Sequence, residues 1–212
     1  MPKKLLLLII SLLAITILSV FIVVVLPERA FQKDELVEIP TTLSEPLITF
    51  VDPIRGNKDA KITIVEFGDF ACALCKSIEP ALQAVISEAP NKRRLIWKDA
   101  PNVNEHAETF TASMAARCAQ DQGKFWEYHD RLMLPGTSLN AENLVNIAVQ
   151  LELNEASFQS CMASDVTRPI VQHTLEEAFA LDISGTPTIF LNGVEYTGPL
   201  TIEGINSAID SL

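Results

Sequence analysis

Basic residues are scarce in this sequence of 212 residues, which has 16 lysines and arginines against 27 aspartates and glutamates. Only two of the basic residues, and none of the acidic ones, precede residue 27. The remainder therefore carries 14 basic and 27 acidic residues, a net charge of −13. The one basic run, Lys92-Arg93-Arg94, lies before a predicted strand. Because phosphate contacts need clustered lysine and arginine, this composition argues against a nucleic-acid partner.

Residues that bind transition metals are also few, with four cysteines and three histidines. A structural zinc site usually takes four ligands, often from two closely spaced pairs. Cys72 and Cys75 are closely spaced, whereas Cys118 and Cys161 are not paired in the sequence. The histidines are scattered over a long stretch: His106, His129 and His173. We therefore expect neither a metal site nor a cofactor, and the aromatic neighbours of His129 favour a packing role for it.

Internal repeats and low-complexity tracts are absent from the sequence. Residues 27–58 contain four prolines and no sustained helical period, which is typical of a linker and an approach to a domain. We assign residues 27–51 to the linker and residues 52–212 to one folded domain of ordinary size. Residues 27–58 are too short and too often interrupted by proline to form a dimerisation domain.

One long hydrophobic run is present, from Leu5 to Leu26. As a helix with a rise of about 1.5 Å per residue it would extend roughly 33 Å, enough to cross a bilayer core. It is longer than the apolar part of a typical signal peptide, and no small-residue cleavage pattern follows it. We therefore expect an uncleaved transmembrane anchor at residues 5–26. The alternative is a cleaved signal that leaves a secreted or periplasmic domain.

The orientation of this anchor is inferred mainly from its position. Lys3 and Lys4 precede the run and Arg29 and Lys33 follow it, so the bias of positive charge is small. A short basic start before a first apolar segment is typical of exported proteins. We expect residues 1–4 in the cytoplasm and the folded domain outside, in a single-pass protein of the cell membrane. Disulfides persist in that compartment.

The folded domain begins with a strand–helix–strand pattern. Lys61–Phe70 has the length and the β-branched content of a buried strand, and the CxxC pair Cys72 and Cys75 follows at once. Lys76–Ala89 has helical spacing of its apolar residues, and Arg94–Pro101 is predicted as a second buried strand. The CxxC motif is thus predicted at the strand-to-helix junction of a βαβ unit.

A helical block follows at about residues 104–181, and strands then return. The five segments with helical periodicity are Asn104–Gln122, Lys124–Met133, Ala141–Leu151, Glu155–Ala163 and Thr167–Leu181. Thr186–Gly193 and Val194–Gly198 are predicted strands, joined by an Asn192-Gly193 hairpin turn. Ile202–Leu212 is predicted as a closing helix. The order is βαβ, a helical block, then ββα.

This order resembles a thioredoxin fold with a helical insertion, as in the DsbA-like thiol–disulfide oxidoreductases. The resemblance covers roughly Asp52–Leu212, and three stretches carry it: VEFGDFACALC, RCAQDQGKFWEYHDRLM and ISGTPTIFLNG. It implies an α/β thioredoxin fold with an inserted all-helical subdomain at about residues 104–181. The predicted transmembrane helix would precede this domain.

The position of Cys72 favours thiol chemistry. A helix N-terminus has unpaired N–H groups and a partial positive charge, so the pKa of Cys72 should be lowered. Cys75, one turn later, should be more buried and should resolve a mixed disulfide. The resemblance implies that Cys72 is the attacking residue. Ala73-Leu74 offers neither a hydrogen-bond donor nor a charge, so we expect a less oxidising couple than in the strongest oxidases.

Glu66 is a second candidate because it interrupts an apolar strand six residues before Cys72. Strand alternation places it on the face of Ile62 and Ile64, where burial would raise its pKa. The alternative is an acid at a strand end that reaches solvent. The resemblance implies a proton relay to the resolving thiol. Asp69 and Asp99 are weaker candidates for a nearby charge.

The remaining site residues are Thr186, Pro187 and the second pair of cysteines. The resemblance implies a cis Thr186–Pro187 bond against the CxxC motif, with the Thr186 backbone free to pair with substrate. The alternative is a trans proline that starts an edge strand. In an oxidising compartment Cys118 and Cys161 are left to form a structural disulfide, and the alternative is two buried thiols.

These features predict an extracytoplasmic enzyme that forms disulfides in exported proteins through the Cys72–Cys75 couple. Exported proteins with cysteines would be its substrates. The resemblance implies reoxidation by a membrane partner of the DsbB or vitamin-K-epoxide-reductase type. Two alternatives stay open: a reductase or isomerase on the same fold, or a non-catalytic binding module such as a metallochaperone.

Overall fold

The computed structural model describes residues 42–212. The predicted cytoplasmic residues 1–4, the predicted anchor at residues 5–26 and most of the predicted linker lie outside the described residues. Within residues 42–212, no helix combines the length and the apolar character needed to cross a membrane.

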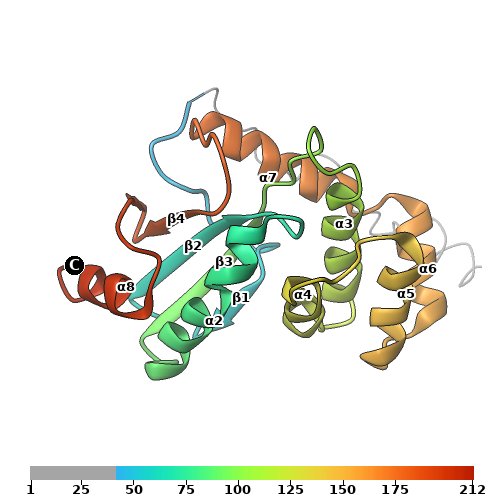
Figure 1. Cartoon of the computed structure of the whole chain (residues 1–212), viewed down its shortest axis with the longest axis horizontal. Helices are drawn as coiled ribbons and strands as arrows, with labels where there is room; N and C mark the ends of the chain where they lie inside the picture. Colours follow the sequence, from blue (N-terminus) through green and yellow to red (C-terminus); the bar gives the residue numbers. More distant parts are fainter. Residues whose placement is uncertain (1–41) are drawn as a thin grey trace, which may run out of the picture. The chain divides into compact units, whose positions relative to one another are not determined.

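A five-stranded sheet forms the centre of the domain, with the strand order β1-β3-β2-β4-β5 (Figure 1). Strands β2 and β3 run parallel, and the other neighbouring pairs are antiparallel. The strands are β1 (Ile54–Gly56), β2 (Ile62–Gly68), β3 (Arg93–Asp99), β4 (Thr188–Leu191) and β5 (Val194–Tyr196). The predicted thioredoxin-like α/β architecture with a helical insertion is thus present in the described residues.

Strand β1 corrects the prediction, which gave residues 27–58 no regular structure. It pairs antiparallel with β3, and Ile54 lies opposite Ile96. Three residues are too few for strand alternation to be recognised, so the pairing with β3 decides its conformation. Gly56 ends the strand with a φ of +94°, and a Cβ there would lie 2.4 Å from the Arg93 carbonyl oxygen. Only glycine fits this close approach without a shift of the backbone.

Helices cover both faces of the sheet. Helices α2 (Ala73–Glu88) and α8 (Ile202–Ile209) pack on the face that carries Ile64 of β2. Helix α7 (Arg168–Ala180) packs on the face that carries Val65 and Phe67. Figure 1 shows α7 extending from the helical insertion to the sheet. Because alternate residues of β2 point to opposite faces, Glu66 shares the α2 face with Ile64.

The helical insertion packs around a hydrophobic core that it shares with Phe70, Cys75 and Trp97 of the sheet side. Its helices are α3 (Thr109–Gln120), α4 (Phe125–Met133), α5 (Ala141–Gln150) and α6 (Glu155–Ser164). Helix α3 begins at Thr109 and not at Asn104, because the preceding turns are held by other contacts, among them the Asn102 N–H donating to Asp69. Asn140 and Asn154 cap α5 and α6 by accepting backbone N–H groups, which explains the breaks seen in the sequence.

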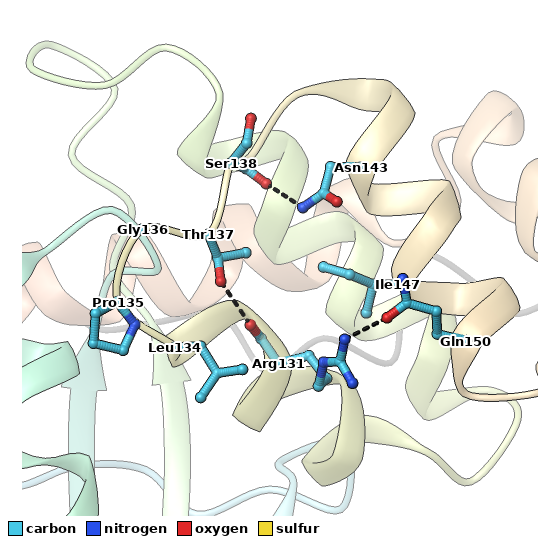
Figure 2. A pocket seen from close by; sticks show the side chains of 9 residues that line it. All are labelled: Arg131, Leu134, Pro135, Gly136, Thr137, Ser138, Asn143, Ile147 and Gln150. Carbon is cyan, nitrogen blue, oxygen red and sulfur yellow. Dashed lines mark hydrogen bonds between the residues drawn. The ribbon is translucent and has the colours of Figure 1, made fainter.

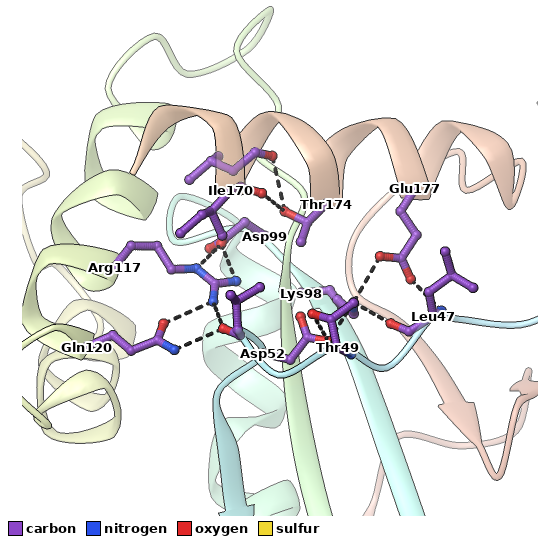
Figure 3. Close-up of polar contacts among 12 residues, drawn as sticks. Leu47, Thr49, Asp52, Lys98, Asp99, Arg117, Gln120, Ile170, Thr174 and Glu177 are labelled. Carbon is purple, nitrogen blue, oxygen red and sulfur yellow. Dashed lines mark hydrogen bonds and ion pairs between the residues drawn. The ribbon is translucent and has the colours of Figure 1, made fainter. Parts of the chain in front are cut away.

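Buried ion pairs bind the residues before β1 to the rest of the domain (Figure 3). Lys98 Nζ lies 2.9 Å from both Asp52 and Glu177, and all three side chains are fully buried. Leu47 donates its N–H to Glu177 and accepts a hydrogen bond from Lys98. Arg117 pairs with Asp99 at 2.7 Å on the other side of this network. Residues 43–51, assigned to the linker from the sequence, therefore contact β3 and α7.

Candidate functional site

Cys72 is the N-cap of α2, so this helix begins at Ala73, three residues before the predicted start. The Cys72 Sγ accepts the Cys75 backbone N–H at 3.1 Å. It also lies 3.4 Å from the carbonyl oxygen of Thr186. Both cysteines of the pair are thiols in this structure; Cys72 is partly exposed, whereas Cys75 is fully buried. Cys75 is thus the more buried of the two, as predicted.

The surroundings move the pKa values of the two thiols in opposite directions. Hydrogen bonding from the Cys75 thiol, followed by the Cys75 N–H, lowers the pKa of Cys72 to about 6, against the opposing effect of partial burial. Burial raises the pKa of Cys75, and the hydrogen bond to Cys72 and the charge of Glu66 add to this rise. At neutral pH the arrangement favours a thiolate on Cys72 and a neutral thiol on Cys75.

Thr186 and Pro187 lie beside the CxxC motif, directly before β4. The Thr186–Pro187 bond is cis, as predicted, and the alternative of a trans proline is wrong. Strand β4 pairs with β2, which ends just before the CxxC motif. This pairing brings residues 186 and 72 together across 114 positions of sequence, and it leaves Thr186 and Pro187 partly exposed at the edge of the site.

Glu66 lies inside the sheet, and the alternative of an acid in solvent is wrong. Its side chain is fully buried, and neither carboxylate oxygen has a hydrogen-bond partner among residues 42–212. Burial raises its pKa well above the ordinary value, and the charges of Glu79 and Cys72 raise it further, against a smaller lowering effect of Arg55. A neutral carboxyl group is therefore favoured beneath the cysteines.

Asp69 and Asp99 hold the structure around the site together. Asp69 accepts hydrogen bonds from the backbone N–H groups of Ala71 and Asn102, which shapes the loop before Cys72. Asp99 accepts from the Trp97 indole and from the Arg117 guanidinium. Both carboxylates are thus occupied by hydrogen bonds, in part from distant segments: Asn102 for Asp69 and Arg117 of α3 for Asp99.

Several charged residues near the cysteines are not among the predicted site residues. Glu79 is four residues after Cys75 on the buried face of α2, and a charge at that helical spacing was a usable signal. Arg55, on the missed strand β1, pairs with Glu79 at 3.2 Å. Lys76 directly follows Cys75 and lies outside the dipeptide between the cysteines. Burial lowers the pKa of Lys76, while the charges of Asp69, Cys72 and Cys75 raise it.

Glu79, His129 and Asp130 offer ligand atoms within 4.8 Å of one another. Arg55 already pairs with both carboxylates, at 3.2 Å to Glu79 and 2.6 Å to Asp130. A guanidinium group therefore supplies the positive charge at this cluster, and the arrangement does not favour a metal ion there. His129 is buried among aromatic rings, in agreement with the predicted packing role.

The cavities at the surface of the described residues include two of a few hundred cubic ångströms. One, of about 410 Å³, lies between α4 and α5 and contains none of the predicted site residues (Figure 2). In Figure 2 Arg131 points toward Gln150 and Thr137 toward the backbone of Arg131. The other, of about 320 Å³, is bordered by Thr186, by Val103 and by Phe179. The second cavity therefore adjoins the CxxC site on the side of Thr186.

Cys118 and Cys161 form the predicted disulfide, which connects α3 to α6 with a Cα–Cα distance of 5.8 Å. The bond joins two residues of the insertion that are 43 positions apart in the sequence. Such a cross-link reduces the conformational freedom of the unfolded chain.

Removal of this disulfide should destabilise the domain without changing the CxxC couple. The double substitution Cys118→Ala, Cys161→Ala is expected to lower the free energy of unfolding by about 2–4 kcal/mol. Denaturant unfolding of both proteins measures this difference. Equilibration with glutathione should give the same CxxC potential for both. An unchanged midpoint of unfolding, or two free thiols in a denatured Cys72→Ser, Cys75→Ser protein without reductant, would contradict the structural role.

Comparison with known proteins agrees with the fold. The family profile described as Thioredoxin matches residues 49–211. Among curated proteins, the Na⁺/H⁺ antiporter NhaA 1 of Salinispora arenicola is 34% identical over 160 residues, which are 76% of this chain and 24% of that protein. NhaA 3 of Salinispora tropica is 32% identical over 160 residues, with the same coverage of both chains. The chain thus spans about a quarter of the length of these curated relatives.

Several solved structures have the same architecture. BdbD from Bacillus subtilis superposes with a TM-score of 0.71 at 20% identity, covering 80% of this chain and 96% of that one. The thiol–disulfide exchange protein α-DsbA2 from Wolbachia pipientis gives 0.65 at 20% identity, covering 76% and 87%. A thioredoxin-like oxidoreductase from Silicibacter pomeroyi gives 0.69 at 24% identity, covering 77% and 92%. The chain therefore belongs to the thioredoxin family, and it shares its fold with BdbD and α-DsbA2.

Proposed function

We propose that this chain is a thiol–disulfide oxidoreductase that acts as an oxidase, passing the Cys72–Cys75 disulfide to exported proteins. One observation carries the proposal: the Cys72 Sγ accepts a backbone N–H at the start of α2, and its pKa is lowered to about 6. A stabilised thiolate favours the reduced form of the couple, so the disulfide form is a better oxidant.

The proposed reaction consists of two successive thiol–disulfide exchanges. A substrate thiolate attacks the Cys72 sulfur of the oxidised couple, the Cys72–Cys75 bond breaks, and Cys75 leaves as a thiolate. Because the pKa of Cys75 is raised by burial, this thiolate takes up a proton, which the Glu66 carboxyl group supplies. A second substrate thiolate then attacks the mixed disulfide and Cys72 leaves as a thiolate. The substrate loses two electrons and the couple gains them.

The region around Thr186 suits an extended substrate chain. The Thr186 carbonyl lies 3.4 Å from the Cys72 Sγ, and the adjoining cavity is bordered by apolar side chains such as Val103 and Phe179. These side chains are exposed by 45% and 70%. In the proposal, Thr186 and Pro187 position the substrate backbone beside Cys72, by the main-chain pairing used in strand addition.

The cellular setting belongs to the proposal as well. Residues 5–26 would anchor the chain in the cell membrane and leave the domain outside the cytoplasm, in a compartment that permits disulfides. A membrane protein of the DsbB or vitamin-K-epoxide-reductase type would reoxidise the couple by accepting its two electrons. Exported proteins with reduced cysteines would be the substrates.

The redox potential of the couple tests the proposal most directly. Equilibration of residues 42–212 with glutathione buffers should give a potential between about −200 and −120 mV, above that of a thioredoxin and not above that of the strongest oxidases. The domain should also oxidise a reduced test protein. A potential near −270 mV, typical of a thioredoxin, would instead assign the chain to the reductases. Failure to exchange with glutathione would favour a binding module.

A further inference from the structure

The cavity of about 320 Å³ beside Thr186 adjoins the sulfur that a substrate must reach. Thr186 borders this cavity, and its carbonyl oxygen lies 3.4 Å from the Cys72 Sγ. An extended chain covers only about 3.3 Å per residue. A polypeptide segment joined to Cys72 by a mixed disulfide therefore has the residues next to its cysteine beside this cavity.

The lining of the cavity is neutral, although the protein is strongly acidic. None of the residues that border it is ionisable, whereas the chain after residue 26 has 27 acidic and 14 basic residues. The large apolar side chains come from two walls: Val103 from the loop after β3, and Leu175 and Phe179 from α7. Such a lining suits an apolar group and disfavours a charged one, which would lose its contact with water.

Two of these apolar side chains are unusually exposed. Phe179 is 70% exposed and Val103 is 45% exposed. A single exposed apolar side chain needs no explanation, but several around one cavity are typical of a binding surface. The cavity between α4 and α5 differs, because Arg131 and Gln150 form a hydrogen bond at its border (Figure 2). Among these two cavities, only the one beside Thr186 combines a neutral lining with a reactive thiol.

Hydrogen bonds fix the wall that carries Val103 to the loop before Cys72. The Asn102 N–H donates to Asp69 at 2.8 Å, and the same carboxylate accepts the Ala71 N–H at 2.7 Å. The Ala100 N–H donates to the Gly68 carbonyl oxygen at 2.9 Å. Asp69 therefore sets the position of this wall relative to the CxxC motif.

Packing fixes the other wall. Ala178 of α7 is buried in the cluster that contains Val65 and Phe67 of the sheet, and Ile183 packs against that cluster. The Thr188 hydroxyl donates to the Gly185 carbonyl oxygen at 2.8 Å, which holds the segment before Pro187. The cavity is thus preformed, so a side chain that enters it does not have to order its walls.

We propose that this cavity is a specificity pocket for the oxidase function proposed above, on which the inference rests. It takes the apolar side chain of a residue within two positions of the substrate cysteine, and Phe179 and Val103 are the specificity-determining residues. The exchange is the one already given: the substrate thiolate attacks the Cys72 sulfur and Cys75 leaves.

The pocket also defines the class of substrate. Cysteines and large apolar side chains are both mostly buried in folded proteins, so a substrate presents the two together mainly before it folds. The preferred substrates are therefore unfolded chains in which an apolar residue lies next to the reactive cysteine.

Oxidation of matched dithiol peptides by the full chain tests the pocket. The peptides carry Leu, Ser, Asp or Lys at one of the four positions within two residues of the first cysteine. Each rate constant is divided by that of the same peptide with oxidised glutathione, which removes differences in thiol reactivity. At one position at least, the Leu peptide should react about 10-fold faster than the Ser peptide, at the low end of discrimination by an apolar pocket. The charged peptides should be slower still.

Charged variants of the pocket should change the order of the peptides. Phe179→Asp should favour the Lys peptide over the Leu peptide, and Phe179→Lys should favour the Asp peptide. Val103→Asp, on the other wall, should act like Phe179→Asp and keeps the test open if the Phe179 variants fail to fold. Leu134→Asp is the control, because Leu134 is 51% exposed and borders the other cavity. It should keep the wild-type order, and a purely structural defect would slow all peptides alike.

The outcomes that overturn the pocket differ from those that overturn the function. Equal normalised rates for the Leu, Ser and Asp peptides in the wild type would show that the cavity does not select substrates. A preference for Leu that survives unchanged in the charged variants would place the selection elsewhere. In both cases the peptides are still oxidised, so the proposed function stands. If the wild type neither oxidises a peptide nor exchanges with glutathione, the proposed function fails and the pocket fails with it.

Discussion

Replacing Cys72 by serine is expected to abolish oxidation of a reduced test protein, a fall of about 10³-fold or more, because the attacked sulfur is lost. Replacing Cys75 by alanine should instead trap mixed disulfides on Cys72, since no neighbouring thiol remains to resolve them. Refolding of a reduced disulfide protein, followed by non-reducing gels of the enzyme, measures both effects.

The pH dependence of alkylation checks the same assignment. In the reduced protein the rate of labelling should be half-maximal near pH 6, the pKa of Cys72. The pKa of Cys72 in the folded protein lies below that of an ordinary cysteine thiol. The thiolate therefore stabilises the reduced protein fully at pH values above the ordinary thiol pKa. This stabilisation is lost as the pH falls through about 6. Faster labelling of Cys75 than of Cys72 at mildly acidic pH would reverse the two roles.

Replacing Lys98 by methionine is expected to destabilise the domain by about 3–5 kcal/mol, the usual cost of breaking a buried ion pair. The substitution leaves Asp52 and Glu177 fully buried without their shared cation (Figure 3). It also removes the hydrogen bond to Leu47, which helps to hold the residues before β1. Urea unfolding of the variant and the wild type measures the difference.

The pH dependence of this loss of stability shows whether it comes from the unpaired carboxylates or from lost packing. Protonated carboxyl groups cost less to bury, so the deficit of Lys98→Met should shrink as the pH falls. Lys58→Met is the matched control, because Lys58 and Asp59 form an ion pair whose side chains are 77% and 72% exposed. It should stay within about 0.5 kcal/mol of the wild type. A Lys98→Met protein as stable as the wild type at neutral pH would contradict this role of the network.

The sequence by itself determined the features that depend on neighbouring residues. The apolar run of β2, the helical spacing after it and the CxxC between them are local patterns, so the strand-to-helix junction of Cys72 could be predicted. The alternation of side chains along β2 predicted that Glu66 lies on a buried face of the strand. The Asn192-Gly193 turn could be predicted because both residues need a positive φ, and they have +46° and +86°.

The tertiary structure decided the contacts that connect distant segments. Arg55 reaches Glu79 from a strand of three residues that forms only by pairing with β3. His129 and Asp130 approach Glu79 from the insertion, 50 residues away, because α4 packs beside α2 through the core that includes Phe70 and Cys75. Periodicity shows which face of each element is buried, but not which buried faces meet. The charged groups around Glu66 depend on which buried faces pack together, so they could be identified only in the folded chain.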